Sequence, residues 1–287
     1  MEKTKLRKLL INAVKILVSV ALLYFVFKKI PFRDVAKLWS TVNVFYVILG
    51  AIFFLASQVL STKRLEFYLN SNEFNLDFRS NLELYFLGMF YNFFIPGGIG
   101  GDAYKVYVLN KKFGWSAKKI TSALFNDRLS GLLAICVLIL IFSAFLFEIQ
   151  WVLLMIALII IGIGIAYFLT KKLFSTYIPI FFKTFSLSIF IQLLQVICFF
   201  LIMKSLGVND DFTIYTVTFL GSSVLSLISF AGIGVREMLF LQASKYFNFN
   251  PSISVSASLL FTVITAFFSF FGIIFQLRKL NLKLTEK

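Results

Sequence analysis

Five of the ionisable side chains inside long apolar stretches of the sequence are candidates for binding a substrate. A charged group at the centre of a bilayer costs at least about 2.5–3.5 kcal/mol, so such residues persist mainly where they are paired or bind something. Arg128 lies about nine residues after Lys119 in one apolar stretch, which puts it roughly 13 Å along a helix axis. Its planar guanidinium with a fixed charge suits a phosphate group. The five candidates for substrate binding are Asp102, Asp127, Arg128, Arg236 and Glu237.

Two glycine-rich turns accompany these charges. A turn of this kind that opens a helix presents free backbone N–H groups and the positive end of the helix dipole, which favour an anion. The structural alternative is that Asp127 with Arg128 and Arg236 with Glu237 form charge pairs, and that the glycines allow close helix packing. The turns and the arm before the first of them add the candidates Asn92, Pro96, Gly97, Gly98, Gly100, Gly101, Gly232 and Gly234.

The composition shows which elements must position these residues. Of 287 residues, 60% are hydrophobic and only 14% are charged, and the mean hydropathy is +0.91. Such a chain uses lipid as its solvent, and its long apolar runs predict an all-α integral membrane protein with one polytopic domain over residues 1–287. Histidine is absent and the two cysteines lie in separate apolar segments. We therefore expect no metal site and no cofactor.

Six long apolar segments predict full transmembrane helices, and two further regions are broken by glycine clusters. We interpret the broken regions, Leu82–Leu109 and Phe212–Gln242, as re-entrant hairpins, although eight spans result if each is counted as crossing. Leu9–Phe27 follows a basic start but precedes no small-residue cleavage site, so we read it as a retained anchor. The six segments are Leu9–Phe27, Asn43–Leu60, Ile120–Phe147, Trp151–Leu169, Thr184–Met203 and Ile253–Phe275.

The basic residues predict the orientation. Lysines and arginines gather at the N-terminus, in residues 63–79, 105–119 and 171–183, and in the C-terminal tail. The positive-inside rule then places both termini of a multi-pass cell (plasma) membrane protein in the cytoplasm, with residues 28–37 as the dissenting loop. Contact with anionic lipid headgroups explains the net charge of +15 better than binding to nucleic acid.

This topology predicts an inverted repeat, with halves at approximately residues 43–147 and 184–276. In each half, two spans flank one glycine-broken hairpin, and the second half enters the membrane from the opposite side. Both hairpin turns contain Gly-Ile-Gly, and aligning these places Asp102 opposite Arg236. Paired interrupted helices of this kind point to a transporter site near the bilayer midplane.

Four segments of the chain carry a resemblance to a known family. They are Asn92–Asp102, Tyr104–Tyr107, Asn126–Arg128 with Gly131, and Gly232–Glu237. Together they resemble the lysylphosphatidylglycerol synthase transmembrane region, also called the flippase-like domain family. Its members include the membrane half of the bacterial multiple peptide resistance factor, which flips aminoacylated phosphatidylglycerol. The resemblance implies a lipid translocase and carries over Asp102, Arg128 and Glu237 by motif position. The aminoacyl transfer of that factor resides in a soluble domain that we do not expect in this chain.

We therefore expect a protein that moves an anionic phospholipid or a polyprenyl-phosphate-linked headgroup across the bilayer and is not an enzyme. Two alternatives stay open. One is an intramembrane lipid-phosphate transferase that uses Asp102 or Glu237 as a base. The other is a membrane partner subunit for a separately encoded lipid-modifying enzyme. The sequence does not decide the oligomeric state, and no nucleotide-binding motif points to direct use of ATP.

Overall fold

The computed structural model describes residues 24, 32–94, 100–209, 212–225, 234–247, 249–278 and 280–285. Apart from one isolated β-bridge between Leu76 and Leu284, its regular structure in these ranges is helical. The elements are α2 (Phe32–Ser40), α3 (Val44–Asn70), α4 (Phe78–Phe94), α5 (Gly100–Phe113), α6 (Ala117–Ser143), α7 (Ile149–Leu173), η1 (Ser175–Ile180), α8 (Phe181–Ser205), α9 (Phe212–Leu225), α10 (Val235–Phe247) and α11 (Pro251–Leu277).

Five of the described helical segments are long and apolar enough to cross a membrane: α3, α6, α7, η1 with α8, and α11. They correspond to five of the six predicted spans, which confirms the all-α membrane fold. The remaining predicted span, Leu9–Phe27, lies outside the described residues except for Tyr24. Helix α3 continues to Asn70, well beyond the predicted end at Leu60.

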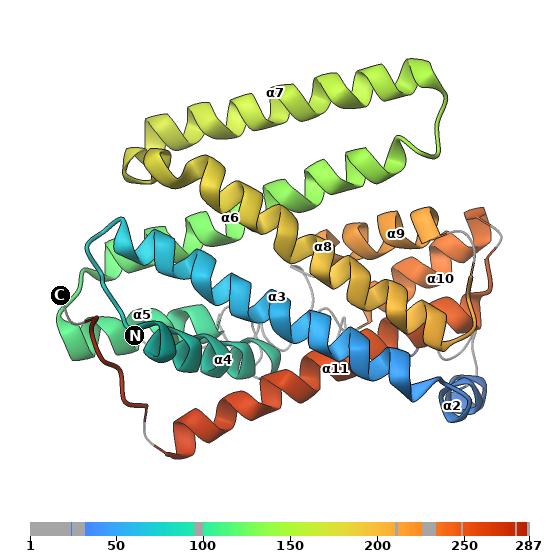
Figure 1. Ribbon diagram of the computed structural model, residues 1–287, viewed down its shortest axis with the longest axis horizontal. Helices are drawn as coiled ribbons and strands as arrows, with labels where there is room; N and C mark the ends of the chain where they lie inside the picture. The colour runs from blue at the N-terminus through green and yellow to red at the C-terminus, as the bar shows by residue number, and fades with distance from the viewer. Residues whose placement is uncertain are drawn as a thin grey trace.

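The two glycine-broken regions form pairs of short helices. Helices α4, α5, α9 and α10 have 17, 14, 14 and 13 residues, which correspond to roughly 20–26 Å at 1.5 Å per residue. This is shorter than a hydrocarbon core of about 30 Å. In Figure 1 the pair α4 and α5 occupies one end of the molecule and the pair α9 and α10 the other. Their lengths and places are those of two hairpins that enter from opposite ends.

The helix bounds of the two halves repeat at one constant offset in residue number. Helix α6 begins at Ala117 and α11 at Pro251, and the difference between these residue numbers equals the difference between the numbers of the last residues of the two helices. We call this constant difference in residue number the repeat shift. It also carries the first residue of α4 onto the first residue of α9, and the last residue of α5 onto the last residue of α10. The units α3–α6 and α8–α11 therefore keep one register from Phe78 onward.

Equivalent helices of the two units run in opposite directions. Gly50, near the start of α3, lies against Cys198 near the end of α8, and Tyr68, near the end of α3, donates a hydrogen bond to Thr184 at the start of α8 (2.9 Å). Helices α6 and α11 also cross the molecule in opposite senses in Figure 1. Two units with equivalent elements in opposite directions constitute an inverted-topology repeat.

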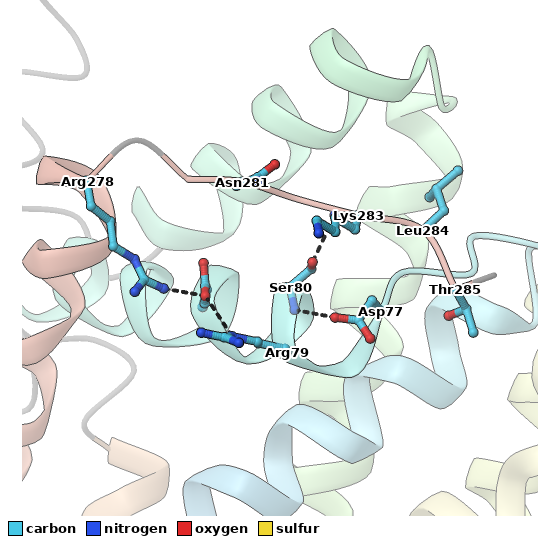
Figure 2. A pocket seen from close by; sticks show the side chains of 9 residues that line it. Asp77, Arg79, Ser80, Arg278, Asn281, Lys283, Leu284 and Thr285 are labelled. Atoms are coloured by element: carbon cyan, nitrogen blue, oxygen red, sulfur yellow. Dashed lines mark hydrogen bonds and ion pairs between the residues drawn. The ribbon is translucent and has the colours of Figure 1, made fainter.

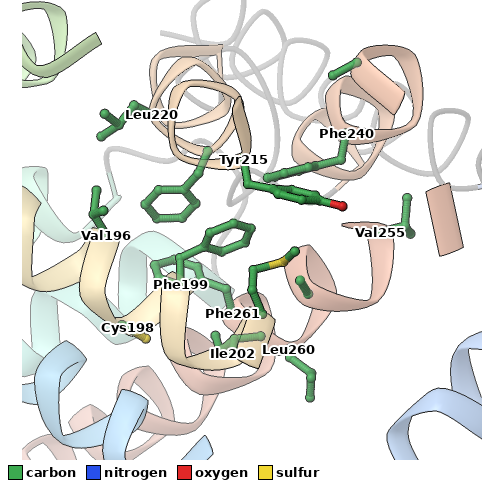
Figure 3. Close-up of a cluster of buried hydrophobic side chains, with 14 of the residues drawn as sticks. Val196, Cys198, Phe199, Ile202, Tyr215, Leu220, Phe240, Val255, Leu260 and Phe261 are labelled. Carbon is green, nitrogen blue, oxygen red and sulfur yellow. The ribbon is translucent and has the colours of Figure 1, made fainter. Parts of the chain in front are cut away.

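An aromatic core holds the second hairpin against the long helices. The Phe199 ring of α8 stacks on Phe219 of α9 and Phe240 of α10, with centroid distances of 4.6 and 5.3 Å. Phe261 of α11 meets Phe219 edge to face at 4.8 Å. Figure 3 shows Phe199, Phe240 and Phe261 within this cluster. Because lipid is as apolar as these side chains, close packing of the rings rather than exclusion from water holds the helices together.

A second core lies at the end of the molecule where the basic loops gather. It joins the end of α3, the start of α6, η1 and the C-terminal tail through Leu65, Ile120, Tyr177 and Leu282. Residues 63–79, 105–119 and 171–183 and the C-terminal tail, which were predicted to lie on one side of the membrane, therefore share one end of the molecule. The N-terminal segment predicted to lie with them is outside the described residues. The assignment of this end to the cytoplasm stays a prediction. Helix α2 packs through Val35 into the other core, at the opposite end.

Candidate functional site

A cavity of about 440 Å³ that contains several charged side chains lies between the first hairpin, the long helices α3, α6 and α8, and the end of α9. Its wall combines charged and amide side chains with apolar ones, which is the composition of a site for an amphipathic ligand. The polar side chains that line it are Gln58, Ser61, Arg64, Tyr85, Asn92, Asp102, Lys105, Asp127, Arg128, Gln192, Gln195 and Ser223.

Three charged groups form the centre of this cavity. Asp102, in the first turn of α5, accepts a hydrogen bond from Nε of Arg128 on α6. Its other carboxylate oxygen lies 3.7 Å from Nζ of Lys105. The Lys105 side chain is buried, with its ammonium 4.6 Å from the centroid of the Tyr85 ring. Two cations face one carboxylate, so this cluster carries a net positive charge.

Arg128 is the accessible member of the cluster. Its side chain is 45% exposed, against 17% for Asp102 and 6% for Lys105. Asp102 engages Nε, so the two terminal nitrogens of the guanidinium have no protein partner among the described residues. These two nitrogens form the fork that binds two oxygens of a phosphate.

A close crossing of α4 and α5 sets the position of Asp102. The Asn92 side-chain oxygen accepts a hydrogen bond from the backbone N–H of Gly101 at 2.8 Å, so it caps the start of α5. A Cβ atom at Gly101 would overlap the backbone of Gly88, so only glycine fits at this crossing. Asn92 and Gly101 thus fix the first turn of α5, and the position of the Asp102 side chain in that turn is fixed with it.

Asp127 has a partner that the sequence did not suggest. Its carboxylate accepts two hydrogen bonds from Arg64 of α3, from Nε at 2.7 Å and from an Nη at 3.1 Å. The other Nη of Arg64 donates to Ser188 of α8 at 2.9 Å. The pair is nearly buried, with side chains 8% and 11% exposed. Asp127 therefore joins α3, α6 and α8, and the alternative of a pair with Arg128 is wrong.

In the second unit, Glu237 closes the turn that begins α10. Gly234 has a φ of +85°, which favours glycine, and its N–H donates to Glu237 Oε2 at 2.7 Å. The other carboxylate oxygen accepts from Ser258 of α11 at 2.9 Å. Glu237 is fully buried. Its carboxylate thus fixes the helix start and ties α10 to α11.

Arg236 lies in a smaller cavity of about 250 Å³ next to the first. Its guanidinium lies 4.9 Å from the centroid of the Phe261 ring and makes one long contact, of 3.5 Å, with the Thr262 hydroxyl. The proposed pairing of Arg236 with Glu237 does not occur, because within the described ranges no ion pair includes either residue.

Of the nine predicted site residues that the structure describes, six lie at the first cavity and three lie in the second unit. Asn92, Asp102, Asp127 and Arg128 line the same cavity, and Gly100 and Gly101 form the first residues of α5 beside it. Arg236 lines the neighbouring cavity, while Gly234 and Glu237 form the turn behind it. Four predicted residues lie outside the described part of the chain: Pro96, Gly97, Gly98 and Gly232.

Sequence reasoning missed several residues of the cavity. Lys105 was counted with the basic residues of segment 105–119 as a charge at the membrane interface, and this is wrong because its side chain is buried against Asp102. The spacing could have revealed it, since residues three apart share one face of a helix. Gln58 and Gln192 also line the cavity, and the repeat shift carries the first onto the second. Only the repeat shows that they are equivalent.

An apolar groove of about 600 Å³ adjoins the cavity around Arg128. It lies between α6, α7 and α8, and three residues of α6 line both spaces: Phe125, Leu129 and Leu132. Helix α7 has no buried residue and lies apart from the other helices in Figure 1. The cavity around Arg128 and the apolar groove thus share one wall at the edge of the molecule.

A fourth space, of about 630 Å³, lies at the end of the molecule between the start of α4 and the C-terminal tail. Glu83 lies within it between Arg278, with which it forms an ion pair, and Arg79 at 3.6 Å. Figure 2 shows the tail crossing α4, where the Lys283 N–H donates to the Ser80 hydroxyl at 2.8 Å. The tail ties α11 to the base of the first hairpin.

Together these features define a polytopic helical membrane protein with an inverted repeat and a cationic cavity beside an apolar groove. The chain belongs to the family described as lysylphosphatidylglycerol synthase TM region, whose model matches residues 12–183 and 172–272. This confirms the resemblance seen in the sequence and places the chain among lipid-related membrane proteins. A comparison with curated proteins gave no match.

Proposed function

We propose that this protein is a translocase that moves an anionic phospholipid or a polyprenyl-phosphate-linked headgroup across the bilayer. One observation carries the proposal: the cationic cavity around Arg128 and the apolar groove beside α7 share the wall formed by Phe125, Leu129 and Leu132. A soluble anion needs only the first space. A lipid needs both, because its phosphate requires cations and its hydrocarbon chains require an apolar path.

Arg128 supplies the contact with the phosphate. Its guanidinium is nearly half exposed in the cavity, and the ion pair with Asp102 orients it. Lys105 lies on the other side of the Asp102 carboxylate. The cluster has one cation in excess, so binding of a phosphate monoanion neutralises it. Charge neutralisation inside the membrane offsets the cost of burying either charge alone.

Transport fits the carboxylates of this site better than catalysis does. A general base needs a carboxylate that can reach a substrate proton. Asp102 is engaged by Arg128 and Lys105, and both oxygens of Glu237 accept hydrogen bonds from the α10 turn and α11. Each carboxylate therefore orients a neighbouring group, which is the role we assign to them.

The proposed location is the cell membrane, with both termini in the cytoplasm. The ends of α3 and α11, the starts of α6 and η1, and the basic segments beside them lie together at one end of the molecule. Placing this end in the cytoplasm satisfies the positive-inside rule and brings the basic loops to anionic lipid headgroups.

The test is lipid scrambling by purified protein in liposomes. Fluorescent phosphatidylglycerol, phosphatidylcholine and a polyprenyl-phosphate analogue are compared for the wild type and for Arg128→Gln. The matched control is Arg79→Gln, which replaces an exposed arginine outside the cavity. We expect Arg128→Gln to slow movement of the anionic lipids at least about tenfold, the effect of about 1.4 kcal/mol, and Arg79→Gln to leave it unchanged.

Equal rates for the wild type and Arg128→Gln would refute the proposed site. If the wild type moves no lipid, the translocase function itself is refuted, and a partner subunit of a separately encoded lipid-modifying enzyme becomes the better explanation. Release of phosphate from the lipid analogue would instead support the transferase alternative.

A further inference from the structure

Arg236 is a buried cation that forms no direct ion pair among the described residues. It is 9% exposed, and its Nε has no hydrogen-bond partner in the part of the chain that the structure describes. Its neighbour Glu237 accepts hydrogen bonds from Gly234 and Ser258. Glu237 is linked to Arg236 indirectly, through the Thr262 hydroxyl, which lies 3.5 Å from each of the two side chains. Removing an arginine from water without a carboxylate or an equivalent anion is costly, because its Coulombic partner is missing. A buried guanidinium that lines a cavity and has no carboxylate in direct contact among the described residues therefore points to an anionic ligand.

The internal repeat relates Arg236 to the first cluster. The repeat shift carries Asp102 onto Arg236 and Arg128 onto Thr262. In the first unit, Asp102 contacts Arg128. In the second, Arg236 contacts Thr262. The two contacts thus join equivalent positions of the two units: one at the start of the second hairpin helix, and one in the long helix that follows it.

The chemistry of the two contacts differs in one respect. In the first unit the arginine comes from the long helix, and the carboxylate of the hairpin helix partly neutralises it. In the second unit the arginine comes from the hairpin helix, and the long helix offers only the neutral hydroxyl of Thr262. The second position therefore has a cation whose direct contact on the long helix is a neutral hydroxyl, and the Glu237 carboxylate contacts that hydroxyl rather than the guanidinium.

The two arginines line different cavities that meet. Arg128 lines the larger cavity and Arg236 the smaller, and neither space has both in its wall. Four residues line both spaces: Gln58, Met89, Gln195 and Ser223. The repeat shift carries Met89 onto Ser223, so the cavities join near the axis that relates the two units.

We infer that Arg236 and Thr262 form a second phosphate station, separate from Arg128, and that the phosphate passes between the two stations through the shared wall around Gln58. The inference deepens the proposed function, because it divides one midplane site into two successive ones. The recognised group is a phosphate-bearing anion. The planar guanidinium provides its donors, and Phe261 holds the guanidinium by a cation–π contact from one side.

The test counts binding sites independently of transport. Equilibrium dialysis of the purified full chain in detergent uses labelled dihexanoyl phosphatidylglycerol below its micelle concentration. We expect two sites per chain for the wild type, one for Arg236→Gln, one for Arg128→Gln and none for the double variant. A second arm replaces the lipid by labelled inorganic phosphate. If the chain binds two lipid molecules and no inorganic phosphate, the ligand is a lipid headgroup. If it binds two molecules of either compound, the phosphate group alone is sufficient for binding.

Two sites in Arg236→Gln, or one site in the wild type, would overturn the inference. Thr262→Val keeps the shape of the side chain and removes the hydroxyl that faces the guanidinium, so it provides the same comparison if Arg236→Gln does not fold. We expect it to weaken the second site several-fold and leave the first unchanged; an unaltered isotherm would overturn the inference. A wild type that binds two lipids and moves none refutes translocation while leaving the second station in place.

Discussion

The pair formed by Arg64 and Asp127 allows the role of Asp127 to be tested directly. Replacing Asp127 by leucine leaves the Arg64 guanidinium buried, with Ser188 as its one hydrogen-bond partner among the described residues. Two hydrogen bonds of 2.7 and 3.1 Å are lost. Because both side chains are nearly buried, with 8% and 11% exposed, solvent screens the pair little. Removing one partner of such a pair costs about 3–5 kcal/mol.

The double variant Arg64→Met with Asp127→Leu removes both charges at once. Replacing a buried ion pair by apolar groups of similar size is often neutral or stabilising, so we expect it to be close to the wild type. At roughly 2–4 °C per kcal/mol, the melting temperature of the single variant should fall by about 6–20 °C. The assay is the fraction of protein that remains monodisperse on size-exclusion chromatography after heating in detergent.

A single variant as stable as the double variant would refute the reasoning, because the charges would then not be coupled. The double variant also separates the two roles of Asp127. If Asp127 only holds α3 to α6 and α8, the double variant moves lipid at the wild-type rate. If a stable double variant fails to move lipid, this ion pair contributes to the transport mechanism and is not only structural.

Two further predictions concern the first hairpin and the orientation of the chain. Gly101→Ala forces α4 and α5 apart, so we expect it to lower the free energy of unfolding by about 1–3 kcal/mol or more. Gly162→Ala, on α7 with no atom near the new Cβ, should change it little or raise it by up to about 1 kcal/mol. Thermal unfolding of both variants measures the difference, and equal destabilisation of the two would contradict the close crossing of α4 and α5 at Gly101. For the orientation, a cysteine at the exposed Thr285, in a chain free of the two native cysteines, should react with a membrane-impermeant maleimide only after cells are opened. Labelling of intact cells would place the C-terminus outside.

The spans and hairpins could be predicted from the sequence because they depend on local properties. Long apolar runs and interrupting glycines record where a helix can cross lipid and where its backbone must turn. The end of α3 could not be predicted in this way. Its last turns include Arg64, which reads as a loop charge after Lys63, and only a carboxylate far along the chain, that of Asp127, makes its burial possible.

The site could be predicted in residue types but not in its pairings. Asp102 and Arg128 were expected as intramembrane charges, whereas their mutual contact joins residues on different helices. Lys105 was misassigned because counting charges treats every lysine near the end of a segment as a loop residue. The spacing of Gly234 and Glu237 is that of a capping box, so the capping role of this carboxylate was readable in the sequence.

The repeat has one consequence for the motions of the molecule. Helix α6 packs along α8, whereas the equivalent pair, α11 and α3, is in contact over a much shorter stretch. Two chemically similar units therefore adopt unequal arrangements in a single conformation. If the protein is the translocase that we propose, exchanging these arrangements would produce a second conformation in which α3 and α11 pack together while α6 and α8 separate. The positions at which the two units differ would then set the free-energy difference between the two conformations.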